Sequence, residues 1–212
     1  MVTFDMWRMY LRSRRLERGA VSMLAAMVIA YIWGENTVVV PGFGPQGAAF
    51  LMATLLLPTP VVAGALACLG SDEMESRELG AVRRLPWWDV GLVTGWLLVL
   101  PVALVLAIGD ASKVPPEAMT GALWWTALGF AAAVFLGRRL AWSIPVVTTV
   151  ALVLFGLDGD RPLWWAIPFH AVTPAKVALA VLVYLVAAGG YIWFSQRPRG
   201  RWTVHWGAGA RH

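Results

Sequence analysis

Residues 88 to 108 read WDVGLVTGWLLVLPVALVLAI, an apolar run whose only charged residue, Asp89, stands near its start. An α-helix needs about 20 such residues to cross the hydrocarbon core of a bilayer. Five other stretches have the same apolar character, and they cover residues 20–33, 47–70, 121–136, 142–157 and 177–194. We therefore predict an all-α integral membrane protein with six transmembrane helices.

The composition excludes a water-soluble fold. Of the 212 residues, 59% are hydrophobic and only 14% are charged, and the mean hydropathy is +0.67. Soluble domains contain about 25% charged residues. We expect one six-helix membrane domain at residues 19–195, with an amphipathic helix at 1–18 before it and a cytoplasmic basic tail at 196–212 after it.

The net charge of +5 comes from basic residues that stand in short clusters between the apolar runs. This scatter argues against nucleic acid as a partner, which would need one basic face. Six spans place fourteen of the seventeen basic residues on the side of the termini, and they are Arg8, Arg12, Arg14, Arg15, Arg18, Arg77, Arg83, Arg84, Arg138, Arg139, Arg197, Arg199, Arg201 and Arg211. Because cytoplasmic loops carry the excess of Lys and Arg, we expect both termini in the cytoplasm.

The N-terminal segment has two different faces at helical spacing. Trp7 and Leu11 lie on an apolar side, whereas Arg8 and Arg12 lie on a charged side. This pattern predicts a helix in the membrane interface with Trp7, Arg8 and Arg12 as its anchors, and a solvated basic leader is the alternative. The apolar run that follows is long enough to span, which favours a first helix or signal anchor over a cleaved leader.

Proline, glycine and tryptophan add weaker signals within the spans. Pro58, Pro60 and Pro101 are expected to bend their helices, because proline removes a backbone donor. Gly91 and Gly95 form a G-x-x-x-G pair, which suits either packing inside the chain or dimerisation. Most of the thirteen Trp residues, including the pair at 124–125, should mark the ends of spans, where hydrocarbon meets water.

The stretch SDEMESRELGAVRRLPWWD, residues 71–89, is longer than a turn between helices requires. It carries eight charges, yet Leu79, Val82 and Leu85 recur at every third position. We predict a short cytoplasmic helix that lies parallel to the membrane, ends at Pro86 and is anchored by the Trp pair that follows. A solvated connector is the alternative.

The run Arg77-Glu78-Leu79-Gly80, followed by Leu85 between the second and third of six spans, resembles the permease subunits of type-2 ATP-binding-cassette exporters. In that family this loop forms a coupling helix that sits in a cleft of the ATPase subunit. The resemblance implies that coupling to the ATPase involves Glu75, Arg77, Glu78, Gly80, Arg83 and Leu85.

The resemblance also implies the partners and the energy source. They are cytoplasmic ATPase subunits, which bind ATP and magnesium, and a second permease subunit of the same or a homologous chain, surrounded by membrane lipids. The chain itself has no G-x-x-x-x-G-K-[ST] motif and no other catalytic signature, so no cofactor is expected in it. The excess of Arg over Lys and the family suggest a bacterial plasma membrane, and the apolar spans suggest export of an amphipathic or lipophilic cargo such as a peptide, lipid or natural product.

The loop LDGDRPLWWAIPFHAVTPAK, residues 157–176, is too apolar for a simple exposed connector. Trp164, Trp165 and Phe169 predict a short helix or re-entrant piece at the outer interface, and similar exporters have short helices there that cap the translocation path. His170 has no H-x-x-x-H or H-E-x-x-H spacing, so a surface or hydrogen-bonded histidine is favoured over a metal ligand.

Two other functions stay open at this point. A membrane enzyme that acts on lipid would use His170 with Asp158 and Asp160, although an acid, base and nucleophile set is not recognisable. A scaffold protein that moves nothing is the other alternative.

Overall fold

The computed structural model describes residues 16–33, 39–41, 49–51, 58–67, 86–110, 114, 116–158 and 161–196. The described elements are mainly helical, with two short antiparallel strand pairs. In chain order they are α2 (Leu16–Trp33), β1 (Val39–Pro41), β2 (Ala49–Leu51), α4 (Pro58–Ala67), α6 (Pro86–Ile108), α7 (Pro116–Phe135), η3 (Arg138–Leu140), α8 (Ser143–Phe155), β3 (Leu157–Asp158), β4 (Arg161–Pro162), η4 (Ile167–Phe169) and α9 (Pro174–Gln196).

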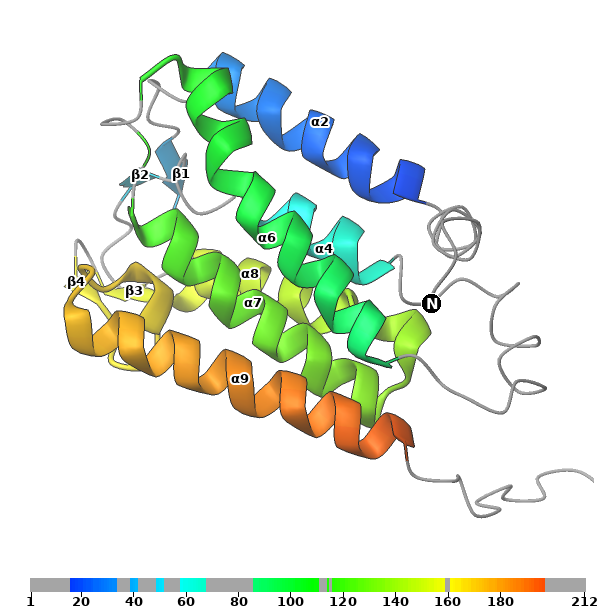
Figure 1. The fold of residues 1–212 in the computed structure, drawn as a ribbon. Coiled ribbons are helices and arrows are strands. Elements are labelled where there is room, and N and C mark those ends of the chain that lie inside the picture. The colour runs from blue at the N-terminus through cyan, green and yellow to red at the C-terminus, as the bar shows by residue number, and fades with distance from the viewer. Residues whose placement is uncertain are drawn as a thin grey trace, which may run out of the picture.

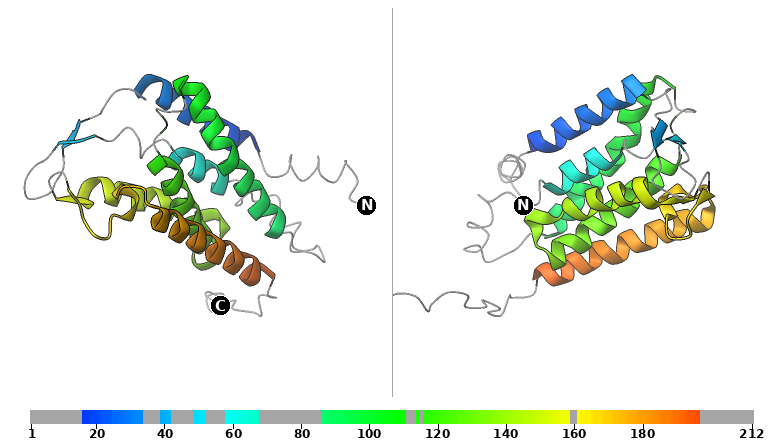
Figure 2. Two further views of the ribbon diagram at one scale, coloured as in Figure 1. Left: turned by 60° about the vertical axis from the view of Figure 1, so that its left-hand side comes forward. Right: turned by 180° about the vertical axis from the view of Figure 1, so that it is seen from behind.

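The α-helices lie side by side and alternate in direction (Figures 1 and 2). The arginine end, defined by Pro86, Arg138 and Gln196, therefore contains the start of α6, the end of α7 and the end of α9. The loop end, at the other side, contains the two strand pairs and the segment before Pro174. The described helices thus run alternately between these two ends.

Three of the described helices are long and apolar enough to cross a membrane: α6, α7 and α9. All three were expected, as residues 88–108, 121–136 and 177–194. The other expected spans are covered by α2, with 18 residues, and by two shorter helices, α4 with 10 and α8 with 13. Helices of 10 and 13 residues fall short of the length that a span requires, about 20 residues.

The expected helix at residues 47–70 was wrong in its first part. Residues 49–51 form β2, which pairs with β1, and the helix begins only at Pro58. Pro58 and Pro60 therefore start a helix instead of bending one in its middle. Proline is favoured in the first turn, where the missing N–H would have no helical partner and the fixed φ already suits a helix.

A similar correction applies to Pro86. Expected at the end of a short cytoplasmic helix, it is the first residue of α6. The Trp pair that was expected to anchor that helix lies on the first turn of α6 instead, with Trp87 and Trp88 both exposed. Residues 68–85, which hold the rest of the expected coupling helix, lie outside the described residues.

Helix α7 forms the centre of the fold and contacts α4, α6, α8 and α9. In the apolar part of α7 that is long enough to cross a membrane, 61% of the residues are buried, whereas the corresponding parts of α6 and α9 are each 28% buried. Small residues explain the close packing, since Ala122, Gly129 and Ala133 let neighbouring helices approach the α7 backbone. Trp125, which was expected near the end of a span, is instead only 1% exposed and fills the centre of the core.

Helices α6 and α9 expose apolar side chains along their length. Leu98, Val102 and Leu106 on α6 and Leu185 and Val186 on α9 are all more than half exposed. Water would disfavour such a surface, whereas lipid tails would cover it without cost. The exposed faces therefore agree with insertion of these helices in a membrane.

Gly129 on α7 gives a prediction with a matched control. A Cβ at this position would clash with Leu66 Cδ1, so Gly129→Ala should overpack the contact between α4 and α7. We expect a loss of about 1–3 kcal/mol in the free energy of unfolding, measured by denaturation in detergent micelles. At Gly189 on α9 nothing lies within 4 Å of the new Cβ. Gly189→Ala should therefore leave stability unchanged or raise it, and equal losses at both sites would contradict the packing described.

Candidate functional site

The residues expected to contact an ATPase lie outside the described part of the chain. They are Glu75, Arg77, Glu78, Gly80, Arg83 and Leu85. The same holds for the expected interfacial anchors Trp7, Arg8 and Arg12. The described residues instead show two polar clusters, one at each end of the helices, and an apolar pocket between α6, α7 and α9.

The cluster at the arginine end is built around Asp89 in the first turn of α6, which is fully buried. Its Oδ2 accepts a hydrogen bond from the Tyr191 hydroxyl at 2.9 Å and lies 3.3 Å from Nη2 of Arg138. The guanidinium of Arg138 also stands over the Tyr191 ring, 5.8 Å from its centroid. These three side chains join α6, η3 and α9, which are distant in sequence.

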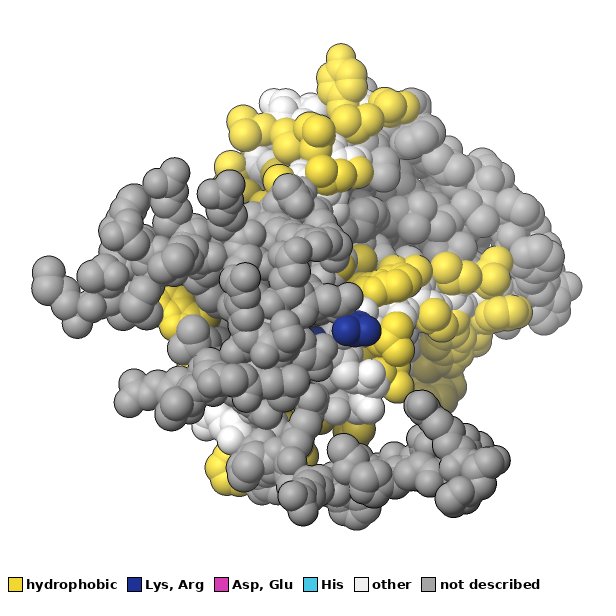
Figure 3. All heavy atoms as spheres, turned by 90° about the vertical axis from the view of Figure 1, so that its right-hand side faces the viewer, with side chains coloured by type: hydrophobic (Ala, Val, Ile, Leu, Met, Phe, Trp, Pro, Cys, Tyr) yellow, Lys and Arg dark blue, Asp and Glu magenta, His cyan; other side chains and the backbone are white. Residues whose placement is uncertain are grey.

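The helix backbone and a neighbouring side chain both stabilise the buried carboxylate of Asp89. A carboxylate in the first turn of a helix is stabilised by the partial positive charge of the helix N-terminus. A buried charge also needs a partner, which the Arg138 guanidinium provides. Seen from the arginine end, basic side-chain atoms stand out among hydrophobic side chains of the described part (Figure 3). The arrangement fixes the relative positions of three helix ends.

This cluster was missed from the sequence. Asp89 is recognisable there only as a charge at the junction between the loop and the apolar run, and Arg138 only as one of the basic residues that give the orientation. A usable signal was present: an acid at the start of one apolar run, an arginine at the end of the next, and a tyrosine near the end of the last fall on one side of a membrane when the helices alternate. Such residues would have been candidates for an ion pair.

At the loop end, Lys176 in the first turn of α9 is buried. Its ammonium group donates hydrogen bonds to the backbone carbonyls of Pro168 and His170. It therefore holds the segment between β4 and α9 against the start of α9. The imidazole of His170 is also used within this segment, because its Nε2 lies 3.1 Å from the Leu163 carbonyl oxygen. This contact agrees with a hydrogen-bonded histidine.

The expected outer-loop gate residues lie in this same segment. Trp164 is 85% exposed on a turn, and Trp165 beside it is also exposed. Phe169 ends the three-residue 3₁₀-helix η4. The short helix predicted here is thus a single 3₁₀ turn. The exposed Trp164 indole would suit the membrane interface, where an apolar ring with one N–H donor is favoured.

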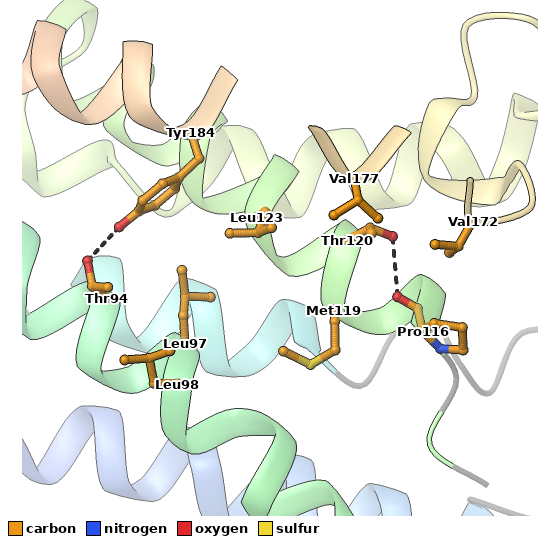
Figure 4. Close-up of a pocket in the computed structure, with 10 residues that line it drawn as sticks. All are labelled: Thr94, Leu97, Leu98, Pro116, Met119, Thr120, Leu123, Val172, Val177 and Tyr184. Carbon is orange, nitrogen blue, oxygen red and sulfur yellow. Dashed lines mark hydrogen bonds between the residues drawn. The ribbon is translucent and has the colours of Figure 1, made fainter. Parts of the chain in front are cut away.

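A pocket of about 410 Å³ lies between α6, α7 and α9 (Figure 4). This volume is within the range of small-molecule sites, about 300–1,000 Å³. The lining is mainly aliphatic and includes Leu97, Leu98, Met119, Leu123, Val177 and Tyr184. At one end of the pocket the hydroxyls of Thr94 and Tyr184 lie 2.6 Å apart. The pocket can therefore hold an apolar molecule or an apolar part of one.

Within the described ranges, no three His, Cys, Asp or Glu side chains gather closely enough to hold a metal ion. Comparison of the chain with protein-family models, with curated proteins and with solved structures gave no match.

Proposed function

We propose that this chain is the membrane-spanning permease subunit of an ATP-binding-cassette exporter. It pairs with a second permease subunit, identical or homologous, and with two cytoplasmic ATPase subunits that bind ATP and magnesium. Six membrane crossings in a bacterial plasma membrane place both termini in the cytoplasm. ATP binding in the partner drives a change between inward-facing and outward-facing arrangements, which moves an amphipathic or lipophilic cargo out of the cell.

The observation that carries this proposal is the alternating order of the helices. Helix α4 ends at Ala67 and contacts η3, and α6 starts at Pro86, whose neighbour Asp89 is bonded to Arg138 in η3. Both ends of the connection between α4 and α6, Ala67 and Pro86, therefore lie at the arginine end. This is the side on which a coupling segment has to meet a cytoplasmic ATPase.

The charge distribution supports the same orientation. Arg138 and Arg139 belong to the described residues and stand at the arginine end, between α7 and α8. The loop end holds one arginine of the described strands, Arg161 in β4, and the buried Lys176, whose ammonium group is bonded to loop carbonyls. An excess of arginine at one end favours the cytoplasmic side for that end.

The surface of α6 supports a second permease subunit. A Cβ added at Gly91 or at Gly95 would have no atom within 4 Å, so the G-x-x-x-G pair does not serve a close contact inside the described part of the chain. Of the two roles considered for this pair, internal packing is thus not observed, and dimerisation stays as the proposed one. Small residues at this spacing let two helix backbones approach closely in a membrane.

Co-expression with an ATP-binding-cassette ATPase encoded next to this chain tests the proposal. With a tag on the permease alone, we expect the ATPase to co-purify and to hydrolyse ATP in the complex. Replacement of the P-loop lysine of the ATPase should abolish hydrolysis and retain the complex. Purification of the permease without any ATPase, under conditions in which both are expressed, would overturn the proposal.

A further inference from the structure

The pocket between α6, α7 and α9 has a hydrogen-bonding pattern that limits what it can hold. Thr94 Oγ1 donates its hydrogen to the Val90 carbonyl oxygen at 2.7 Å. A hydroxyl has a single hydrogen, so the 2.6 Å contact between Thr94 and Tyr184 requires Tyr184 to be the donor. Thr120 Oγ1, the third hydroxyl of the lining, lies 3.1 Å from the Glu117 carbonyl oxygen and donates to it.

All three hydroxyl hydrogens of the lining are therefore used within the protein. The remaining lining residues, such as Leu97, Met119 and Leu123, are aliphatic and offer no donor. The hydroxyl oxygens keep acceptor lone pairs, but almost none of the pocket surface is polar. A water molecule in a cavity needs about two to four polar partners, and a polar ligand would lose most of its hydrogen bonds to water without replacement. An occupant made of hydrocarbon loses nothing on entry.

The position of the pocket along the helices indicates which hydrocarbon enters. The lining of α9 runs from Val177, close to the loop end, to Tyr184 near the middle of the helix. Seven residues of α-helix correspond to about 10 Å, which is most of one half of a hydrocarbon core about 30 Å thick. The pocket thus extends from one membrane face toward the midplane, as the tail of a lipid in one leaflet does.

The pocket is also accessible from the side of the helices. Leu98, which contributes to the lining from α6, is 70% exposed, and Val177, which contributes from α9, is 37% exposed. Both residues belong to helices long and apolar enough to cross a membrane. In a single chain, the side that they border faces the hydrocarbon of the bilayer, from which a tail can enter without passing through water. Gly91, Gly95 and Leu98 lie on one face of α6, so a second permease subunit bound at the Gly91–Gly95 pair would compete with the tail for this entrance.

We propose that this pocket holds one acyl tail of a membrane phospholipid from the leaflet at the loop end. The tail lies between α6, α7 and α9 with its methyl end toward the Thr94–Tyr184 pair and its ester end toward Val177. This inference requires only that the three helices cross a membrane. It does not depend on an ATPase or on transport.

The test uses the permease alone, in nanodiscs of unlabelled phosphatidylcholine with a small fraction of photoreactive phosphatidylcholine. The photoreactive lipid carries a diazirine near the methyl end of one tail. After illumination, peptide mass spectrometry locates the adducts. We expect adducts on Leu123 and Tyr184, which line the pocket, in addition to those on exposed residues of α6 and α9.

Two substitutions on α6 separate a bound tail from general lipid contact. Leu98→Trp places a large ring at the pocket entrance and should reduce the Leu123 adducts about tenfold, the effect of about two buried methylene groups on occupancy. Leu106→Trp is the matched control, since Leu106 is 71% exposed on the same helix and does not line the pocket. It should leave those adducts unchanged.

Thermal unfolding shows whether Leu98→Trp folds. If it does not, Val177→Phe replaces it, because this change narrows the pocket entrance from α9 and should also reduce the Leu123 adducts. Absence of adducts on Leu123 in the wild type would overturn the proposal and would mean that another segment or a second copy of the chain fills the pocket. Adducts that persist unchanged in both folded entrance variants would overturn it as well.

Discussion

Asp89→Ala is expected to lower the free energy of unfolding by about 3 kcal/mol, because it removes one partner of a buried ion pair. Asp89 is fully buried and is bonded both to Tyr191 and to Arg138. Its loss leaves the Arg138 guanidinium without this carboxylate. The figure is taken at the low end of the range for buried pairs, since Arg138 is 19% exposed and retains some hydration. Thermal or chemical denaturation in detergent micelles measures the effect.

Three further variants identify the cause of this loss. Asp89→Asn keeps the shape and an acceptor for Tyr191 but loses the charge, so we expect a smaller destabilisation. Asp89→Leu combined with Arg138→Met replaces the ion pair by apolar side chains and should recover most of the stability. Arg138→Ala removes the other partner of the pair and should destabilise the protein by a similar amount. Unchanged stability in both Asp89→Ala and Arg138→Ala would mean that the ion pair contributes nothing.

The long helices could be predicted because their sequences contain one strong signal. Residues 88–108 and 177–194 are nearly uninterrupted apolar runs, and the structure places α6 and α9 there with starts only two or three residues earlier. Helix α4 could not be predicted in the same way. The apolar run at 47–70 is as hydrophobic as a span, and hydropathy alone does not distinguish a strand at 49–51 from a helix. The proline pair at 58 and 60 was the available boundary signal.

The polar contacts were harder to predict because they join residues far apart in sequence. Asp89 and Tyr191 are 102 positions apart, and Thr94 and Tyr184 are 90 apart. Only the packing of α6 against α9 brings each pair together. Sequence spacing identifies partners on the same helix, because residues three or four positions apart lie next to each other on its surface. It gives no register between two helices, so the ion pair and the closed hydroxyl pair required the structure.

The two pairs have opposite consequences for the space between α6 and α9. At the arginine end, the Asp89 pair joins the helices through charged hydrogen bonds, which are the stronger kind. Nearer the loop end, the Thr94–Tyr184 pair is followed by the apolar pocket, where α6 does not close on α9. Helices α6 and α9 are thus bonded to each other at the arginine end and separated by the pocket toward the loop end. A rigid-body movement of α6 relative to α9 would therefore have to strain or break the bonds of Asp89.

Replacement of Arg77 and Glu78 by Ala is expected to abolish the conformational response to ATP while ATP hydrolysis by the complex continues. Under the proposed function, these residues belong to the segment that the ATPase pushes. ATP can shift the permease between two arrangements only through contacts that differ between them. A loss of about 1.4 kcal/mol in those contacts already lowers the shifted population about tenfold, and two charged residues should contribute at least that much.

The measurement does not require a known cargo. Ala171 is an exposed position of the loop end. A spin label at Ala171→Cys, in a Cys68→Ser background, reports the distance between two copies of this chain, or the distance to a label at the matching loop of a homologous second subunit. We expect ATP and magnesium to change this distance in the otherwise unmodified complex and to leave it unchanged in the Arg77→Ala, Glu78→Ala variant. Asp158→Ala with Arg161→Ala removes one acid and one base from the opposite loop, at two positions that pair between β3 and β4.

This control pair has the same effect on net charge and should keep the response to ATP. It also addresses the alternative of a lipid-modifying enzyme, for which Asp158 was a candidate site residue and the segment around Arg77 had no role. A response that persists in the Arg77→Ala, Glu78→Ala variant would show that residues 71–89 are not the coupling segment. If the response is lost instead in the Asp158→Ala, Arg161→Ala control, the determinant of the switch lies at the loop end, and the proposed direction of force from the ATPase side would be wrong.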